Sequence, residues 1–337
     1  MSKYLLIASE FGSHNAVFPV LEELAGREQV GYIGVKDIEN LPLVLQKKNT
    51  SVHEAARIYH DFDVFLTGTS GYSMIEYNAW KYAQEAGKKS FCILDQWKNY
   101  KERFCRNGGI LFPDSILVID DISRQNILHL GARDDQVIVT GSPHLDRLIE
   151  MGNSSSGNSA LKKKFRVGDR RVVTFCTESI VKLREKRKYG YDEYTVIEDI
   201  LEYLKDRIDT LLIIKPHPDD DIDIYQKYSG SSQIRIAGDV NTIDLFKVSD
   251  AVVGMNSMAL LEAYLMKVPI ISYQPVDKLN IRDDVRLILD VVGVEKTIFT
   301  RVDFENKLDD ILDNRFEFHE FYTHSRSTDR IVNLLLN

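Results

Sequence analysis

The sequence predicts an α/β protein of two domains, each with a parallel sheet covered by helices on both faces. The chain has 337 residues, which exceeds what a single hydrophobic core usually covers. Short apolar runs alternate with stretches of helical periodicity, a rhythm typical of parallel sheets with crossover helices. A Gly/Ser/Asn-rich stretch within residues 151–163 separates two such series and is expected to be a flexible linker.

The first series predicts an N-terminal domain over residues 1–150. Its opening run, Tyr4–Ala8, is apolar throughout, as buried parallel strands are. Apolar residues recur with helical spacing from Ala16 to Leu24, so a helix should follow this strand. A further helix is expected around Val52–His60, and further strands are expected at Val30–Val35, Val64–Leu66, Lys89–Leu94, Ser115–Ile119 and Gln136–Thr140.

The second series predicts a C-terminal domain over residues 164–315. Residues 316–337 are aromatic and then apolar at helical spacing, so we expect terminal helices that pack back toward the first domain. Two such domains facing each other across a cleft are the expected assembly. The predicted strands are Arg171–Phe175, Thr210–Ile214, Ala251–Val253 and Pro269–Tyr273, and the predicted helices are Tyr194–Asp206, Thr242–Val248 and Met258–Lys267.

Composition and charge argue against several classes of protein. The net charge of -8 argues against general nucleic-acid binding, which needs an excess of Lys and Arg. No apolar run reaches the ~20 residues of a membrane span, and the apolar N-terminal part is too short for a signal peptide. We therefore expect a cytoplasmic protein. Three widely spaced cysteines fit neither a disulfide framework nor a zinc site, so we expect reduced thiols at Cys92, Cys105 and Cys176.

Two turns that follow predicted strands are the most informative motifs. Lys215-Pro216-His217-Pro218 closes one apolar run, and Gly254-Met255-Asn256-Ser257 closes another about forty residues later. The carboxyl ends of parallel strands are where open α/β sheets bind ligands. A cation, an imidazole and a hydroxyl that opens a helix suit an anion there, which predicts a phosphate site. The alternative is that the prolines only end a strand and that His217 caps it locally.

The second half resembles the C-terminal domain of GT-B glycosyltransferases. The resemblance rests on Ser249–Ala263, closed by Val268-Pro269-Ile270-Ile271, and covers most of residues 165–290 in layout. With the Lys-Pro-His-Pro turn, the pair is similar to motifs of bacterial sialyltransferases, polysialyltransferases and CDP-glycerol glycerophosphotransferases, and distantly to UDP-GlcNAc 2-epimerases. It implies a GT-B fold, two Rossmann-like domains facing each other across a cleft. It also implies a cytidine nucleotide in the C-terminal domain.

Each candidate nucleotide-binding residue has a chemical role and an ordinary alternative. Ser257 and the first-turn N–H groups can hold a phosphate oxygen, although a plain N-cap uses the same donors. His217 can stabilise charge on the leaving group. Lys215 can add a charge or extend along the strand end. Glu262 is implied by the resemblance to bind ribose hydroxyls, the alternative being a solvated charge. Thr177, Glu178, Pro218 and Asn256 complete the expected nucleotide site.

The first domain should bind the acceptor. A hydroxyl that attacks a sugar must lose its proton, so a carboxylate or histidine is required there. Asp95 is the first choice for this base, with the N-cap of a helix starting at Gln96 as its alternative, and Glu10 and His14 follow. Trp97, Tyr100 and Arg103 can line one face, with Trp97 suited to a sugar ring. The other expected substrate contacts are Gly12, Ser13, Thr69 and Ser70.

Two runs of charged residues, one basic and one acidic, lie in the second half of the chain. Lys182–Lys188 is basic and could guide an anionic acceptor or touch anionic lipid, but a solvated loop is the favoured reading. Asp219-Asp220-Asp221 cannot turn three consecutive carboxylates toward one ion, and no metal-ligand spacing is found elsewhere. We therefore expect neither a metal nor a bound cofactor.

The function expected from these observations is metal-independent glycosyl transfer. The donor would be a nucleotide-sugar, with a CMP-linked nonulosonic acid favoured. The acceptor would be a glycan or a lipid-linked glycan in bacterial surface polysaccharide synthesis, with peripheral membrane association and no nucleic-acid partner. The alternatives are a UDP-sugar 2-epimerase or nucleotide-sugar hydrolase on the same fold, a CDP-glycerol-type phosphotransferase, and a non-catalytic sugar-nucleotide sensor.

Overall fold

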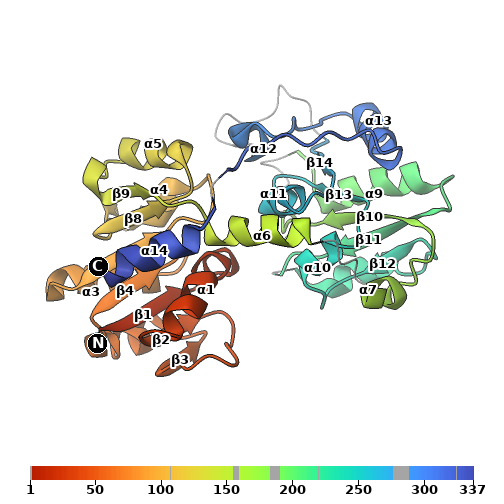
Figure 1. The fold of residues 1–337 in the computed structure, drawn as a ribbon. Helices are drawn as coiled ribbons and strands as arrows, with labels where there is room; N and C mark the ends of the chain where they lie inside the picture. The colour runs from red at the N-terminus through yellow and green to blue at the C-terminus, as the bar shows by residue number, and fades with distance from the viewer. Residues whose placement is uncertain are drawn as a thin grey trace. The chain divides into compact units, whose positions relative to one another are not determined.

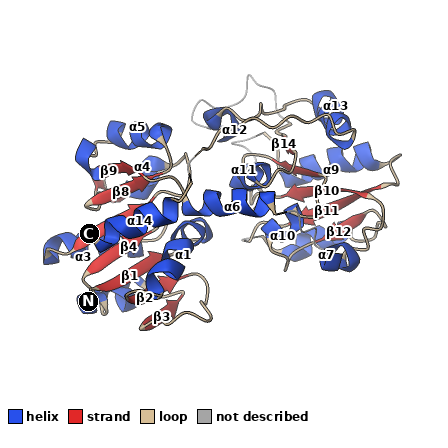
Figure 2. Cartoon of the chain, viewed as in Figure 1, coloured by secondary structure: helices blue, strands red, loops and turns tan. Residues whose placement is uncertain are grey.

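The structure is a computed structural model that describes residues 2–106, 108–154, 159–182, 190–218, 220–275, 288–323 and 325–337. The chain forms two compact units, Met1–Arg147 with Thr323–Asn337, and Leu148–Tyr322. Each unit has a parallel sheet with helices packed on it (Figures 1 and 2). The predicted α/β class is therefore confirmed.

The sheet of the first unit has seven strands in the order β3-β2-β1-β4-β5-β8-β9, and every neighbouring pair is parallel. The order reverses between β1 and β4, because the chain first builds β2 and β3 on one side of β1 and then continues on the other side. The strands are β1 Lys3–Ala8, β2 Gln29–Gly34, β3 Leu45–Lys48, β4 Val64–Thr67, β5 Lys89–Ile93, β8 Ser115–Val118 and β9 Val137–Val139.

Helices bury both faces of this sheet. Helices α1 and α14 pack against one face in a core that includes Val17, Leu21, Ile331 and Leu335. The other face is covered by α2, α3, α4 and α5 in two further clusters. The elements are α1 Phe11–Ala25, α2 Val52–Ala56, α3 Ile75–Ala86, α4 Tyr100–Phe104, α5 Asp121–His129, α14 Ser327–Leu336 and a hairpin of β6 Cys105–Arg106 with β7 Gly109–Ile110.

The second unit repeats this plan with five parallel strands in the order β12-β11-β10-β13-β14. Here the order reverses between β10 and β13. The strands are β10 Arg171–Cys176, β11 Thr210–Lys215, β12 Ile234–Ile236, β13 Ala251–Gly254 and β14 Ile270–Ser272, and the helices are α7 Ser159–Lys164, α9 Glu193–Leu204, α10 Thr242–Phe246, α11 Met258–Leu265, α12 Ile288–Val292 and α13 Arg301–Leu312.

Both ends of the predicted linker over residues 151–163 are helical in the described part of the chain. Helix α6, Pro143–Asn153, runs into its first residues, and α7 begins at Ser159. Residues 155–158 lie outside the described part of the chain. The predicted helix at Val52–His60 is shorter, because α2 ends at Ala56 and a separate 3₁₀ turn follows at Tyr59–Asp61.

Candidate functional site

The candidate site residues of each unit follow the strands where the sheet order reverses. Such switch points are where open α/β sheets leave a crevice for ligands, because the loops on either side lead away from each other. In the first unit these are the loops after β1 and β4, and in the second unit those after β10 and β13. The loops after β5 and β11 lie next to them.

In the second unit, the loop after β10 holds the histidine turn. The hydroxyl of Ser179 lies 3.0 Å from Nδ1 of His217. The backbone N–H of His217 donates to Oγ1 of Thr177 at 2.8 Å. Both ring and backbone of His217 are therefore fixed by residues at the end of the central strand.

The same loop also holds the serine turn. The carboxylate of Glu178 accepts a hydrogen bond from the backbone N–H of Asn256. Ser257 is the N-cap of α11 and accepts from the N–H of Ala259 at 3.2 Å. The two turns named by sequence thus meet one three-residue loop at the same edge of the sheet. The N-cap interpretation of Ser257 is confirmed, and it is compatible with an anion site because both use the donors of the first helical turn.

Two acidic residues that were not among the predicted site residues bond to this loop. Asp220 accepts from the Thr177 hydroxyl at 2.9 Å and from Tyr225 at 2.7 Å. Glu193 is fully buried, and both of its carboxylate oxygens accept from the N–H of Val181. Burial raises the pKa of Glu193 to about 7, and Asp220 adds to the shift. Glu193 therefore takes up a proton in the neutral pH range.

Other predicted nucleotide residues have different surroundings. Lys215 donates from Nζ to the carbonyl of Gly238 at 2.9 Å, and burial lowers its pKa. Its charge is therefore directed to the loop after β12. Glu262 is half-buried on α11. Burial raises the pKa of Cys176 to about 12, and the charge of Glu262 adds to this shift. Pro218 is exposed.

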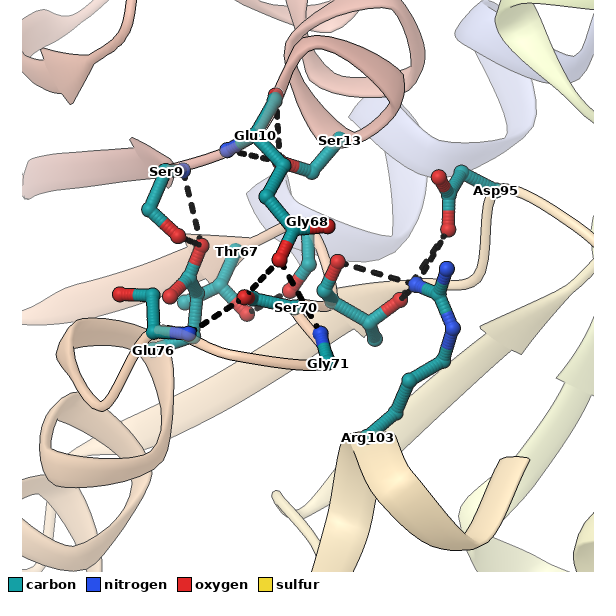
Figure 3. Close-up of polar contacts among 12 residues, drawn as sticks. Ser9, Glu10, Ser13, Thr67, Gly68, Ser70, Gly71, Glu76, Asp95 and Arg103 are labelled. Carbon is teal, nitrogen blue, oxygen red and sulfur yellow. Dashed lines mark hydrogen bonds and ion pairs between the residues drawn. The ribbon is translucent and has the colours of Figure 1, made fainter. Parts of the chain in front are cut away.

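In the first unit, Glu10 joins the loops after β1 and β4 (Figure 3). Its Oε1 accepts from the hydroxyl of Ser70 and from the N–H of Gly71 at 3.2 Å. Glu10 is also the N-cap residue of α1, and its own N–H donates to Oγ of Ser13 at 3.1 Å. The β4 loop packs so closely on this helix that a Cβ at Gly68 would lie 2.1 Å from that of Ser13.

A second carboxyl group, Glu76, lies close to this contact. Its side chain is buried at 2% exposure, and its Oε1 accepts from both the N–H and the hydroxyl of Ser9. Its other oxygen is buried and has no hydrogen-bond partner among the described residues. Burial raises the pKa of Glu76, and Glu10 raises it further. Glu76 was not among the predicted residues, since its sequence position reads as an ordinary first-turn helix acid.

Asp95 is engaged by a buried arginine. Its Oδ1 lies 2.6 Å from Nη1 of Arg103 and accepts from Thr69 at 3.2 Å. The same arginine nitrogen donates to the carbonyl of Thr69 at 3.0 Å. Gly12 lies against the other oxygen, Oδ2, where a Cβ would come within 2.4 Å. The alternative that Asp95 caps a helix starting at Gln96 is wrong, because α4 begins only at Tyr100.

Two predicted residues of the first unit belong to the core. Trp97 is 1% exposed and its indole N–H donates to Asp120 at 2.7 Å, so it offers no face to a sugar ring. His14 is buried, its Nδ1 lies 2.7 Å from the hydroxyl of Tyr32, and its ring stacks on Phe18. Burial lowers the pKa of His14 to about 4, and Lys36 adds to the shift. His14 faces inward on α1, so its imidazole is not exposed as the predicted role of a base requires.

Some predicted features lie outside the described residues, namely residues 183–188 of the basic run and Asp219. Within the described ranges, no group of three or more His, Cys, Asp or Glu side chains is arranged to hold a metal ion. None of the described helices has the length and apolar character needed to span a bilayer.

Comparisons with known proteins support the fold. Residues 176–308 match a family described as a protein of unknown function, DUF354. No curated protein matches the chain. Solved structures that match include a UDP-GlcNAc 2-epimerase from Methanocaldococcus jannaschii, with 14% identity, a TM-score of 0.70 and 99% of each chain covered.

Two further structures match over nearly the whole chain. A putative UDP-N-acetylglucosamine 2-epimerase from Listeria monocytogenes has 17% identity and a TM-score of 0.72, with 99% of this chain and 95% of that chain covered. The wall teichoic acid polymerase TagF has 13% identity and a TM-score of 0.62, with 99% and 88% covered. At these identities the likeness shows the fold, which is the predicted GT-B type with two Rossmann-like domains.

Proposed function

We propose that the chain is a GT-B enzyme that binds a nucleotide-activated sugar in its second unit and transfers the sugar, without a metal, to an acceptor bound by its first unit. The observation that carries this proposal is the arrangement at the switch point of the second sheet. There, one loop after β10 fixes both the His217 turn and the Asn256-Ser257 turn. This places an imidazole and a helix N-terminus at one sheet edge, which suits a nucleotide phosphate.

The second unit would act by stabilising the leaving nucleotide. As the bond to the sugar breaks, negative charge grows on the phosphate, and preorganised donors lower the cost of that charge. His217 donates from an imidazole that Ser179 orients, and the first turn of α11 supplies backbone N–H groups. Glu178 fixes the turn that presents this helix, through its contact with Asn256.

The donor proposed is a cytidine nucleotide carrying a nonulosonic acid, within bacterial surface glycan synthesis. The His-Pro turn supports this choice, since the resemblance to sialyltransferases and CDP-glycerol glycerophosphotransferases lies there. A structure of TagF with CDPG, which is similar to this chain at 10% identity and a TM-score of 0.62, is also in keeping with a cytidine donor.

The acceptor base proposed is Glu10. A general base needs a carboxylate oxygen that can reach the acceptor hydroxyl while the group stays fixed. Ser70 and Gly71 hold one oxygen of Glu10, and its side chain is only half-buried. Asp95, the first choice from sequence, already serves as the counter-charge of Arg103, which makes it the poorer candidate.

The main rival is a UDP-sugar 2-epimerase, which needs acid–base carboxylates and no acceptor. Glu10 with Glu76 beside it favours this candidate, because the pair provides one fixed carboxylate and one carboxyl group whose pKa is raised. A 2-epimerase from Methanocaldococcus jannaschii in complex with UDP-GlcNAc and UDP has the same fold at 15% identity and a TM-score of 0.70. A phosphotransferase using a CDP donor is the third candidate.

Calorimetric titration with CMP, CDP and UDP tests the nucleotide site. We expect a cytidine nucleotide to bind. His217→Asn should lower its affinity at least about tenfold, because one charge-assisted hydrogen bond is worth ~1.5–3 kcal/mol. The matched control is His60→Asn, since that histidine is exposed in the other unit. Binding of UDP without CMP or CDP rejects the cytidine donor, and binding of none of the three rejects the site.

Mass spectrometry of the products separates the candidate reactions. Transfer from CMP-N-acetylneuraminic acid to an acceptor glycan supports the glycosyltransferase, and Glu10→Gln should lower its rate by about 10²–10⁴ while nucleotide affinity is kept. Epimerisation of UDP-GlcNAc without an acceptor supports the rival. A product that gains a phosphate supports the phosphotransferase. An unchanged rate in Glu10→Gln contradicts the assignment of the base.

A further inference from the structure

The loop that follows β4 carries an exposed aromatic ring next to the proposed base. Tyr72 is 91% exposed, more than any other large apolar side chain described. A single exposed tyrosine on a surface is ordinary. What distinguishes this one is how the backbone around it is held.

Several hydrogen bonds fix the backbone on both sides of Tyr72. The hydroxyl of Ser70 accepts from the N–H of Tyr72 at 3.0 Å and from that of Ser73 at 2.7 Å. Arg106 donates from Nη2 to the carbonyls of Ser70 and Ser73, at 2.7 and 3.4 Å. A loop fixed in this way keeps the backbone at Tyr72 in place, so a ligand that contacts the ring does not have to order the loop as well.

The same serine connects the loop to the proposed base. Ser70 donates its hydroxyl proton to Glu10, and Gly71 adds its N–H, so the carboxylate and Tyr72 share one rigid support. Phe11 follows Glu10 directly and is 47% exposed, with the ammonium of Lys36 lying 5.5 Å from its ring centroid. An exposed ring therefore follows each member of the Glu10–Ser70 contact in the chain, Phe11 in the loop after β1 and Tyr72 in the loop after β4.

This combination suits a sugar ring. One face of a pyranose is lined by C–H groups that pack on an aromatic ring, and its edge carries hydroxyls that donate to a carboxylate. The carboxylate of Glu10 accepts hydrogen bonds from hydroxyl groups and repels another carboxylate at short range, which disfavours an anionic sugar there. The chemistry therefore favours a neutral ring.

We propose that Tyr72, supported by Phe11, is an acceptor subsite that stacks a neutral pyranose so that one of its hydroxyls points at Glu10. This deepens the proposed function and depends on it for the role of Glu10. Stacking itself requires only the ring and its fixed loop. The ring face of Tyr72, rather than its hydroxyl, supplies the contact.

Saturation-transfer NMR with three neutral probes tests this subsite directly. The probes are methyl β-D-galactopyranoside, methyl β-D-glucopyranoside and methyl N-acetyl-β-D-glucosaminide at millimolar concentration, with the full chain. We expect at least one to bind, with saturation strongest on the C–H face of its ring. Tyr72→Ala should weaken that binding about fivefold, because the aromatic face on which the sugar packs is lost. Tyr72→Phe should keep it.

The matched control is Ile208→Ala, because Ile208 is an apolar side chain of 81% exposure in the other unit. Equal binding in the wild type and Tyr72→Ala, or no binding of any of the three sugars, overturns the proposal. Titration of Tyr72→Ala with cytidine nucleotides separates this failure from that of the proposed function. Unchanged nucleotide binding beside a failed sugar test rejects only the subsite, and sugar binding without nucleotide binding rejects only the nucleotide site.

Discussion

The two units contain the same contact built into different surroundings. After the first strand of each sheet, a hydroxyl residue precedes a glutamate, Ser9-Glu10 in one unit and Thr177-Glu178 in the other. Each glutamate accepts a backbone N–H from the loop across the switch point, Gly71 or Asn256. In both units the glutamate therefore connects the two loops at the switch point. The chemistry of the site is therefore set by what lies around it.

The surroundings differ in their side chains. Near Glu10, the loops are held by a buried carboxyl group, Glu76, and by the buried ion pair of Asp95 with Arg103. Near Glu178, the acidic residues Asp220 and Glu193 hold the loop as well, but a hydroxyl lies on each side of the His217 imidazole. The comparison teaches that carboxyl groups support the loops of both units, whereas the imidazole that suits a phosphate belongs to the second unit.

The largest effect should come from breaking the buried ion pair. Arg103→Met leaves Asp95 as a buried carboxylate without its counter-charge, which costs ~3–5 kcal/mol. We expect the free energy of unfolding, from urea denaturation, to fall by about this amount. The first unit would then depend on charge pairing for its stability as well as for its loop geometry.

An exposed pair in the second unit is the control for that variant. Arg171 lies 3.0 Å from Asp250, but both side chains are partly exposed. Arg171→Met should cost no more than ~1 kcal/mol, because solvent screens such pairs. Equal losses in the two variants would contradict the view that burial makes the first pair different.

An intermediate effect should appear as opposite responses of the two units to pH. The pKa of His14 is about 4 in the folded chain and near 6.5 when unfolded, so its contribution to stability is lost as pH falls from 6.5 to 4. The pKa of Glu193 is about 7 when folded and near 4.5 when unfolded, so its contribution is lost as pH rises from 4.5 to 7. Each loss amounts to at most ~3 kcal/mol.

Denaturation curves of His14→Gln and Glu193→Gln, collected from pH 4 to pH 8, measure these two slopes. His14→Gln should flatten the loss of stability as pH falls from 6.5 to 4, and Glu193→Gln the loss of stability as pH rises from 4.5 to 7, because a glutamine titrates in neither range. Each variant serves as the control for the other. A variant that flattens the wrong loss, or neither, contradicts the assigned group.

The smallest effect should come from the hydroxyl that orients the imidazole. Ser179→Ala removes the contact with Nδ1 of His217, and the net worth of such a hydrogen bond is ~1 kcal/mol. We expect cytidine nucleotide affinity to fall about fivefold in calorimetric titration. Ser229→Ala, at a hydroxyl that bonds only the nearby Gln226 carbonyl, should change nothing. An unchanged affinity in Ser179→Ala would show that the imidazole needs no orientation.

The sequence predicted the strands that are buried on both faces, because unbroken apolar runs such as those of β1, β10 and β11 have no other common explanation. It missed β3, whose residues Leu45–Lys48 alternate between half-buried and exposed at the sheet edge. It also missed β12, an edge strand in which the charged residue Arg235 interrupts the apolar run.

The candidate site was predicted in part for a similar physical reason. Turns that end strands can be read from the chain, so Glu10, Ser70, His217 and Asn256 were predicted to follow strands, as they do. The partners that give these residues their environment come from elsewhere. Glu76 contacts Ser9 from helix α3, and Arg103 contacts Asp95 from the short helix α4. Neither contact can be predicted from the residues next to it in the sequence.

Helix α14 gives the first unit a dependence on synthesis order. Its residues Ile331, Val332 and Leu335 complete the core that also contains Val17 and Leu21 of α1. Most of this unit is therefore synthesised long before its core can be completed. The apolar residues of α1 that α14 covers stay exposed while the whole second unit is translated. The second unit can therefore finish folding before the first.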